Sequence, residues 1–317
     1  MDQKIKIFNE HVRSAKNIAI FAHKNPDGDA LCSVLAMARL IQLNFGKTPL
    51  CVYDGNIPDN LDNVPDRHKI KYFEHVDMTR PFDLAIVLDY GTIRHLGGAM
   101  PIAENAKYII EIDHHINDDH IGNLCINDVN ASSVGEILYE IIQHGKFKSD
   151  SEINDLLAIS MLTDTGFFKY SRSGKPLRIM AELVDGGVNI GKLANGLNNK
   201  PKKTVLTEAS VVSRTEFFYH GRLALATVNK KDYKNLDGRG EIILNLLGQI
   251  HGVDYVVLLK QQKENQIGFS MRGRDHAVNK FAVALGGGGH EFASGGVING
   301  QDLETVRAKI IELFRGE

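Results

Sequence analysis

Short apolar runs alternate with amphipathic segments along the first half of the chain. The runs with the length and composition of strands span residues 17–22, 48–52, 83–88 and 108–112. The segments with apolar residues at helical spacing span residues 31–43, 132–143, 153–163 and 177–183. Ser133, with Glu136 three residues later, forms a capping-box pattern that indicates the start of a helix. This alternation predicts an α/β domain with a mostly parallel sheet and helices on both faces.

The pattern changes in the second half, where apolar runs occur in pairs. Residues 214–228 predict a hairpin around His220 and Gly221, because two apolar runs flank a turn sequence. Further strands are predicted over residues 255–260, 266–272 and 297–298, and helices over residues 277–285 and 303–314. We therefore expect a smaller α/β domain with a mixed sheet, placed across a cleft from the first.

A polar and basic stretch separates the two patterns. Residues 193–203 contain Lys200, Lys202 and Lys203 and few large apolar side chains, which is typical of a linker. The predicted organisation is a first domain over residues 1–192, a linker region over 193–213 and a second domain over 214–317.

Composition narrows the class of protein. The 317 residues include 37 Lys and Arg against 39 Asp and Glu, so the formal net charge is −2. Proteins that clamp long duplex nucleic acid usually carry a basic excess, which argues against such a partner here. No apolar run approaches the roughly 18 residues of a membrane helix, so no membrane partner is expected. The cysteines Cys32, Cys51 and Cys125 form no C-x-x-C pair, which favours a reduced, cytoplasmic protein.

Candidate metal ligands follow the predicted strands directly. They are His23, Asp27 and Asp29 after the first strand, Asp89 and His114 after two later strands, and Asp164 after a helix. Each alone has an ordinary explanation as a turn, a helix cap or a packed histidine. The carboxyl ends of parallel strands are where open α/β sheets bind ligands, so the groups are expected to share one cleft.

Four carboxylates in one cleft require cations, because each negative charge raises the pKa of the others. Two divalent ions would balance them, with His23 and His114 as neutral nitrogen ligands. Mixed carboxylate and imidazole ligation suits Mn²⁺, with Co²⁺, Mg²⁺ and Zn²⁺ as alternatives. Two neighbouring metal ions serve in-line attack of a shared water on phosphorus, so phosphoester hydrolysis is the expected reaction.

These residues carry a family resemblance. In order and spacing, His23-x-x-x-Asp27-x-Asp29, Asp89, Asp113-His114-His115 and Asp164-Thr-Gly resemble the four motifs of the DHH phosphoesterases. The segment from Asn279 to His290, which contains four consecutive glycines, resembles the glycine-rich motif of the DHH-associated C-terminal domain. Within the family, the chain is most similar to the bacterial nanoRNase and 3′-phosphoadenosine 5′-phosphate phosphatase group.

The resemblance implies a role for each of these residues. His23, Asp27 and Asp89 would hold one metal ion. Asp29, His114 and Asp164 would hold the other, with Asp89 as the bridge. The resemblance also implies that His115 faces the substrate phosphate and that Asp113 orients the histidines. The sequence departs from the family pattern at Cys32, where glycine is common, and at Ser294, where alanine is more usual.

A second candidate site lies in the glycine run. Glycine N–H groups approach an anion without side-chain obstruction, and an arginine can hold a phosphate through two hydrogen bonds. The substrate-binding residues predicted on this basis are Arg272, Gly287, Gly288, Gly289, His290 and Ser294, with Arg274 as a weaker candidate. A flexible helix end is the alternative explanation of the glycines.

One further motif is rejected. Residues 186–192 match a phosphate-binding loop until Leu193 replaces the required Ser or Thr, and they follow a helix rather than a strand. We interpret them as a helix end and a turn.

The expected function is hydrolysis of short single-stranded RNA and of 3′-phosphoadenosine 5′-phosphate. The alternatives are a cyclic or linear dinucleotide phosphodiesterase, a RecJ-like single-strand exonuclease, an inorganic pyrophosphatase and a non-catalytic nucleotide sensor. The short chain and its near-zero charge disfavour a processive exonuclease, and the complete ligand set disfavours a sensor. Whether the protein forms a homodimer is left open by the sequence.

Overall fold

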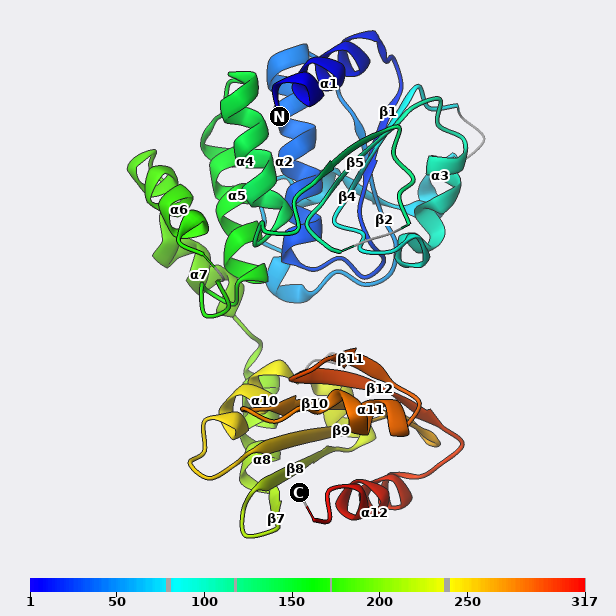
Figure 1. Ribbon diagram of the computed structural model, residues 1–317, viewed down its shortest axis with the longest axis vertical. Coiled ribbons are helices and arrows are strands. Elements are labelled where there is room, and N and C mark those ends of the chain that lie inside the picture. Colours follow the sequence, from blue (N-terminus) through cyan, green and yellow to red (C-terminus); the bar gives the residue numbers. More distant parts are fainter. Residues whose placement is uncertain (78–80, 117–118, 172, 237–239, 317) are drawn as a thin grey trace. The chain divides into compact units, whose positions relative to one another are not determined.

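Two sheets organise the chain in the computed structural model (Figure 1). The structure describes residues 1–77, 81–116, 119–171, 173–236 and 240–316. Contacts divide the chain into two units, Met1–Asn199 and Lys200–Glu317. The boundary falls inside the range predicted as a linker, and that range contains the end of helix α7 (Ile190–Asn198) and all of helix α8 (Lys202–Ser213).

The first unit contains a six-stranded sheet in which every pair of neighbours is parallel. Its order is β3-β2-β1-β4-β5-β6. The strands are β1 (Ile18–Phe21), β2 (Leu50–Tyr53), β3 (Ile70–Tyr72), β4 (Leu84–Leu88), β5 (Ile109–Asp113) and β6 (Leu124–Asn127). The four predicted strands are confirmed as β1, β2, β4 and β5, and the parallel α/β class is confirmed with them. The pattern missed β3 and β6, which are short strands with few buried residues.

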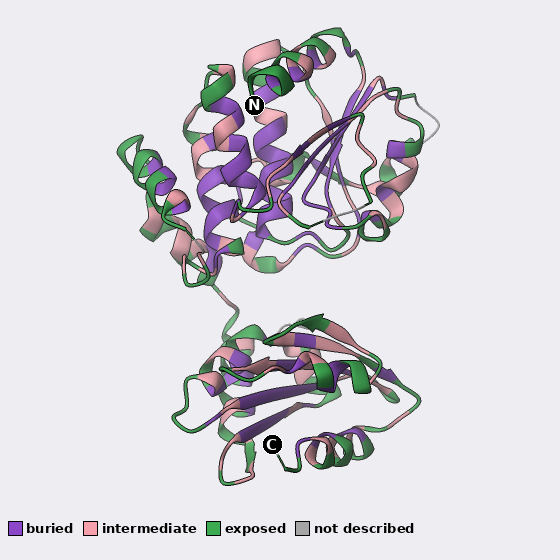
Figure 2. Cartoon of the chain, in the orientation of Figure 1, coloured by how far each residue is buried: buried purple, intermediate pink, exposed green. Residues whose placement is uncertain are grey.

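Alternate residues of the central strands enter different cores. In β1, Ile18 and Ile20 belong to the large core that includes α2 and α5, whereas Ala19 and Phe21 belong to a smaller core on the opposite face. Helices therefore cover both faces (Figures 1 and 2). The α-helices up to α6 are α1 (Asp2–Ser14), α2 (Gly28–Phe45), α3 (Met100–Glu104), α4 (Val134–Gly145), α5 (Ser151–Asp164) and α6 (Lys175–Asp185).

Helices α4 and α5 approach closely at a glycine. A Cβ atom added to Gly135 of α4 would lie 2.1 Å from the Ser160 hydroxyl of α5. We expect Gly135→Ala to lower the free energy of unfolding by about 1–3 kcal/mol, because overpacking forces buried atoms apart. Gly196→Ala in α7 is the matched control, since a Cβ there meets nothing within 4 Å. Urea denaturation of both variants tests this prediction, and equal stability of the two would contradict it.

The second unit contains a mixed sheet of order β11-β12-β10-β9-β8-β7. Only β8 and β9 pair in parallel among the described strands of this sheet. The strands are β7 (Glu216–Phe218), β8 (Leu223–Val228), β9 (Tyr255–Lys263), β10 (Gln266–Gly273), β11 (Gly288–His290) and β12 (Ala293–Asn299). The helices are α8, α9 (Lys230–Asn235), α10 (Glu241–Gly248), α11 (Asn279–Ala284) and α12 (Leu303–Leu313). The mixed sheet, the β7–β8 hairpin and the β9–β10 pair are confirmed.

The glycine run differs from its prediction as a loop or flexible helix end. Helix α11 ends at Ala284, a turn follows at Gly286 with φ +79°, and Gly288 and Gly289 then pair with β12 as an edge strand. Close approach of backbone explains the glycines, because a Cβ at Gly287 would lie 2.4 Å from the Gly295 carbonyl oxygen. The segment is therefore partly a β-strand.

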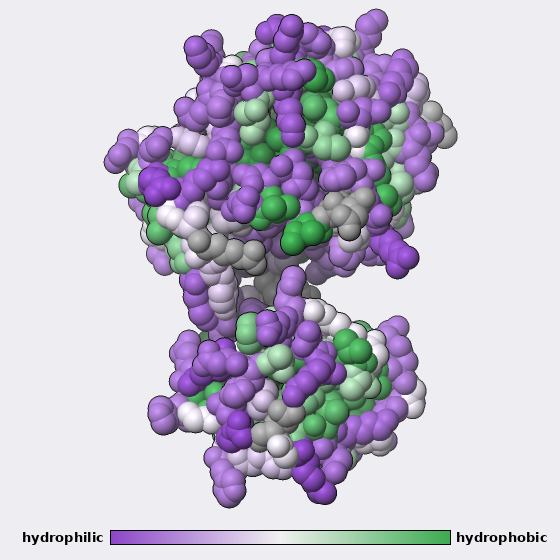
Figure 3. Space-filling model, viewed as in Figure 1, coloured by the Kyte–Doolittle hydropathy of each residue, from purple (hydrophilic) through white to green (hydrophobic). Residues whose placement is uncertain are grey.

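Polar side chains cover most of the visible face of each unit (Figure 3). Within the described ranges, no helix combines the length and the apolar character needed to cross a membrane. Residues 186–192 form the turn after α6 and the start of α7, in agreement with their interpretation as a helix end and a turn.

Candidate metal centre

The strand order brings the predicted ligands of the first unit to one edge of the sheet. The chain moves outward from β1 through β2 in one direction and through β4 in the other, so the topological switch point lies between β1 and β4. In open α/β sheets ligands bind outside the carboxyl ends of the strands at such a point. His23 follows β1 and Asp89 follows β4, so both lie at the switch point.

The first group consists of His23, Asp27 and Asp89. The His23 Nε2 atom lies 3.8 Å from a carboxylate oxygen of Asp27 and 3.8 Å from one of Asp89. Asp27 is also the N-cap of α2, where its carboxylate accepts a hydrogen bond from the Ala30 N–H. Each of the three residues offers one ligand atom, and these three atoms all lie within 4.8 Å of one another. This spacing is suitable for binding one cation.

The second group consists of Asp29, His114 and Asp164. The His114 Nε2 atom lies 3.9 Å from Asp29 Oδ2 and 3.5 Å from Asp164 Oδ2. It also lies 3.5 Å from Asp89 Oδ1, while the other Asp89 oxygen faces His23. Asp89 therefore stands between the two groups, in the position that a bridging carboxylate would need.

Both imidazoles are oriented through the backbone. The His23 Nδ1 atom lies 2.9 Å from the Lys24 carbonyl oxygen, and the His114 Nδ1 atom lies 3.4 Å from the Ala131 carbonyl oxygen. A histidine that donates Nδ1–H to a carbonyl leaves Nε2 as the metal-binding nitrogen. In both residues Nε2 is the atom that faces the carboxylates.

Asp29 is held at the start of α4. Its carboxylate is 1% exposed and accepts hydrogen bonds from the Val134 N–H at 2.7 Å and from the Ser33 and Ser160 hydroxyls at 2.9 and 2.5 Å. The positive end of the α4 dipole also stabilises a negative charge there. The capping box located this helix start, but the sequence did not show that Asp29 would lie against it.

Asp113 lies behind the two groups of candidate ligands. It is fully buried, and its Oδ1 atom accepts hydrogen bonds from the N–H groups of His114 and His115 and from His115 Nδ1 at 2.8 Å. Its Oδ2 atom accepts a hydrogen bond from the Gly91 N–H at 2.9 Å. These contacts join the end of β5 to the residues after Asp89, which has a left-handed φ of 48°.

The electrostatics of the cluster indicate a cation site. Burial raises the pKa of Asp29 well above its usual value, and the charges of Asp89 and Asp164 raise it further. Burial raises the pKa of Asp164 to about 6. Burial alone would lower the pKa of His114, but its interaction with Asp89 and the nearby carboxylates raise it to about 10. Without a metal ion, bound protons therefore offset the negative charge of the crowded carboxylates. Divalent cations would displace these protons and offset the charge instead.

The donor set fits hard or intermediate metal ions. Among the described ligand groups around Asp89, only carboxylate oxygens and imidazole nitrogens face the centre, and none is a cysteine.

His115 lies beside the cluster, with Nδ1 3.5 Å from Asp89 Oδ1 and a half-exposed side chain. The structure thus brings all six predicted metal ligands and both predicted supporting residues, His115 and Asp113, into one region.

The predicted substrate-binding residues lie in the second unit. Arg272 of β10 is cross-strand neighbour to Ala293, which in turn pairs with His290, so these positions lie side by side on three strands. Ser294 donates its hydroxyl hydrogen to the His290 carbonyl oxygen at 2.7 Å. The Arg272 guanidinium contacts both Glu241 carboxylate oxygens at 3.0 Å, a partner that the sequence did not predict. Arg274 binds backbone carbonyls of Gly248 and Ile250.

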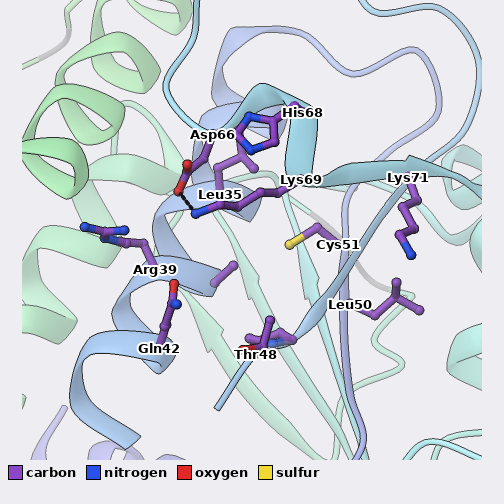
Figure 4. Close-up of a pocket in the computed structure, with 12 residues that line it drawn as sticks. Leu35, Arg39, Gln42, Thr48, Leu50, Cys51, Asp66, His68, Lys69 and Lys71 are labelled. Atoms are coloured by element: carbon purple, nitrogen blue, oxygen red, sulfur yellow. Dashed lines mark hydrogen bonds and ion pairs between the residues drawn. The ribbon is translucent and has the colours of Figure 1, made fainter. Parts of the chain in front are cut away.

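A pocket in the first unit lies away from the candidate metal centre. It has a volume of about 390 Å³ and is lined by α2, the start of β2 and residues 66–71 (Figure 4). Leu50 and Cys51 open β2, so the pocket lies toward the amino ends of the strands. None of the predicted site residues lines it.

A parallel α/β unit with this carboxylate and imidazole cluster, followed by a mixed-sheet unit, is the architecture expected of a metal-dependent phosphoesterase. Two family models match the chain. The DHH family N-terminal domain matches residues 17–163, and the DHHA1 domain matches residues 223–316. The chain belongs to the DHH phosphoesterases, in the group that resembles the NrnA proteins.

Curated relatives support this assignment along nearly the whole chain. The bifunctional oligoribonuclease and PAP phosphatase NrnA of Thermus thermophilus is 26% identical over 99% of this chain and 94% of its own length. The probable bifunctional oligoribonuclease and PAP phosphatase NrnA of Streptococcus mutans is 27% identical over 90% of each chain. A crystal structure of an exopolyphosphatase-related protein from Bacteroides fragilis has the same fold, with a TM-score of 0.88, 23% identity and coverage of 99% of this chain and 96% of its own.

Proposed function

We propose that this protein hydrolyses very short oligoribonucleotides to mononucleotides, and 3′-phosphoadenosine 5′-phosphate to AMP and phosphate. The observation that carries the proposal is the gathering of carboxylates and imidazoles from separate elements around Asp89 at the switch point of the sheet. The names of the Thermus thermophilus and Streptococcus mutans relatives support this pair of substrates. The three cysteines, all free in the structure, agree with a cytoplasmic location.

We propose two Mn²⁺ ions as the bound metals. When bound, such ions stabilise charge on phosphoryl oxygens and lower the pKa of water. One ion would be held by His23, Asp27 and Asp89, and the other by Asp29, Asp89, His114 and Asp164.

The remaining residues of the site position the substrate. Asp113 accepts the Nδ1–H of His115 and so fixes the ring with Nε2 free to contact a phosphoryl oxygen. The half-exposed side chain of His115 agrees with this role, because a group that contacts substrate must be accessible. The buried Asp113 carboxylate holds its neighbours through several hydrogen bonds, which keeps the reacting groups in place without reorganisation.

Arg272 is proposed to bind a phosphate at the nucleotide end of the substrate, with Gly287, Gly288, Gly289, His290 and Ser294 around it. The Nη2 atom of Arg272 contacts both oxygens of Glu241, so a bound phosphate would replace one anionic partner of this guanidinium by another. The Lys260 side chain is partly buried nearby, and this burial lowers its pKa, while the charge of Glu241 opposes the change.

Arg272→Ala is expected to raise KM by roughly tenfold to a hundredfold with little change in kcat, because a lost charged hydrogen bond weakens binding by about 1.5–3 kcal/mol. Arg315→Ala is the control, since Arg315 is an exposed arginine of the same unit that also pairs with a glutamate. Steady-state kinetics on a dinucleotide measures both variants. An unchanged KM for Arg272→Ala would remove this residue from the substrate site.

A panel of substrates tests the proposed function. Purified protein with Mn²⁺ is assayed on RNA oligonucleotides of increasing length, 3′-phosphoadenosine 5′-phosphate, cyclic and linear diadenylate, single-stranded DNA and pyrophosphate. We expect the highest kcat/KM on the shortest RNA and measurable phosphate release from 3′-phosphoadenosine 5′-phosphate. Preference for cyclic dinucleotide, for long DNA or for pyrophosphate would replace the proposal by the corresponding alternative.

A further inference from the structure

A second group of metal-ligating side chains lies in the first unit, outside the centre described above. It consists of Glu111, His120 and Cys125, which offer a carboxylate oxygen, an imidazole nitrogen and a thiol within 4.8 Å of one another. It is the one group of this kind among the described residues that contains a cysteine. Neither the family motifs nor the proposed reaction uses any of the three.

The sheet fixes two of these side chains next to each other. Glu111 of β5 and Cys125 of β6 are register partners in neighbouring parallel strands. The side chains of register partners project from the same face of a sheet. The pairing of β5 with β6 therefore places the Glu111 carboxylate next to the Cys125 thiol. His120 lies in the segment between β5 and β6, and its Nδ1 atom contacts Glu111 Oε1.

The carboxylate of Glu111 is held in one orientation. Its side chain is fully buried, and Oε2 accepts hydrogen bonds from the Tyr90 hydroxyl at 3.1 Å and from the Ile121 and Gly122 N–H groups at 3.0 and 2.8 Å. The other oxygen, Oε1, contacts His120. Oε2 therefore anchors the group and leaves Oε1 as the oxygen that contacts the imidazole. A ligand fixed in this way by hydrogen bonds is typical of a metal site.

The site is accessible from solvent. The His120 side chain is 44% exposed, and Cys125 is partly exposed, so an ion could reach the buried carboxylate oxygen without unfolding the sheet. In contrast, Cys32 and Cys51 are buried. Access and a fixed anionic ligand together distinguish this group from a packed cluster of polar side chains.

We infer that Glu111, His120 and Cys125 form a binding site for a thiolate-preferring divalent cation of the Zn²⁺ class. A thiolate, an imidazole and a carboxylate are all zinc ligands, and three protein ligands leave a fourth position for water. The two anionic ligands balance the charge of the ion. Binding releases the Cys125 thiol proton to solvent and moves the His120 ring proton from Nδ1 to Nε2, so the ligands need no oxidant or other reactant.

The two groups of side chains offer different donor atoms. The centre around Asp89 contains oxygen and nitrogen donors and suits Mn²⁺, whereas a thiolate favours Zn²⁺ or Co²⁺ over Mg²⁺ and Mn²⁺. The inference is independent of the proposed reaction, because it concerns residues that do not contact the substrate in that proposal.

Cobalt titration of the metal-stripped full-length protein tests the site, because Co²⁺ bound to a thiolate gives a near-ultraviolet charge-transfer band that oxygen and nitrogen ligands do not give. We expect this band in the wild-type protein and in Asp89→Ala, which lacks the bridging carboxylate of the other centre. We expect Cys125→Ser to lose the band and Cys51→Ser to retain it. Absence of the band from the wild type, or its survival in Cys125→Ser, would overturn the inference.

A second measurement needs no variant and so does not depend on how a variant folds. Iodoacetamide labelling of the native protein is followed by mass spectrometry with and without Zn²⁺, and with Mn²⁺ as the ion control. We expect Zn²⁺ to slow alkylation of Cys125 at least tenfold and Mn²⁺ to leave the rate unchanged. Equal rates of Cys125 alkylation with and without Zn²⁺ would contradict the site.

Discussion

Asp89→Ala is expected to lower kcat/KM on every substrate by roughly a thousandfold or more, equivalent to about 4 kcal/mol of transition-state stabilisation. The reason is the position of this carboxylate. One oxygen lies 3.8 Å from His23 Nε2 and the other 3.5 Å from His114 Nε2, so its removal takes a ligand from both groups at once. Loss of a ligand that belongs to only one group would leave the other group complete.

Two measurements check this expectation. Rates on a dinucleotide and on 3′-phosphoadenosine 5′-phosphate are compared for wild type, Asp89→Ala and the control Asp185→Ala, an exposed aspartate at the end of α6. Calorimetric titration with Mn²⁺ should show weaker binding in Asp89→Ala alone. Near-normal rates in this variant would contradict the placement of Asp89 at the centre of the site.

Asp113→Ala is expected to reduce kcat by about 10–100-fold and to destabilise the fold. Substitution of a group that orients metal ligands typically costs this factor. The stability effect has a separate cause, because the buried carboxylate accepts hydrogen bonds from the N–H groups of Gly91, His114 and His115, and unsatisfied buried donors cost about 1–3 kcal/mol each.

Asp113→Asn separates the two effects. The amide keeps the shape and one acceptor oxygen, so it should recover part of the stability measured by urea denaturation. It should recover less of kcat, because the neutral group orients the His115 ring less strongly. If Asp113→Ala kept both wild-type kcat and wild-type stability, the supporting role of this residue would be wrong.

The sequence predicted that the candidate ligands lie close together, because most of them follow strand ends. His23 comes after β1, Asp89 after β4 and His114 after β5, and apolar runs locate the ends of these strands to within one or two residues. Parallel neighbours then place their carboxyl ends together whatever the details of packing. To bring these three side chains together, their strands need only be neighbours in one parallel sheet. The alternation of strands and helices along the chain favours such a sheet.

Contacts made by tertiary packing could not be predicted from the sequence. The buried carboxylate of Asp29 is held by Ser160 of α5 and by the start of α4, more than 100 residues away along the chain. No local pattern carries the information that these two helices meet at α2. The pairing of Arg272 with Glu241 was missed for the same reason, since β10 and α10 are joined only by the fold of the second unit.

The glycine run shows a different limit of prediction from the sequence. Four consecutive glycines indicate that side chains are excluded, but they do not say what excludes them. From the sequence we predicted that a bound anion approaches the glycines. In the structure a neighbouring strand approaches them, because Gly288 and Gly289 pair with β12 as an edge strand. An edge strand of glycines still leaves N–H groups accessible, so the proposed role in binding a nucleotide is compatible with this geometry.

The most direct test of the central claim is the activity of metal-stripped protein on a dinucleotide as Mn²⁺ is added back. We predict no mononucleotide release from the stripped protein and recovery of release with Mn²⁺, because the carboxylates around Asp89 need cations to bind and activate a phosphoester. Hydrolysis that continues after complete metal removal would contradict the account. So would the absence of hydrolysis of this dinucleotide after Mn²⁺ is restored.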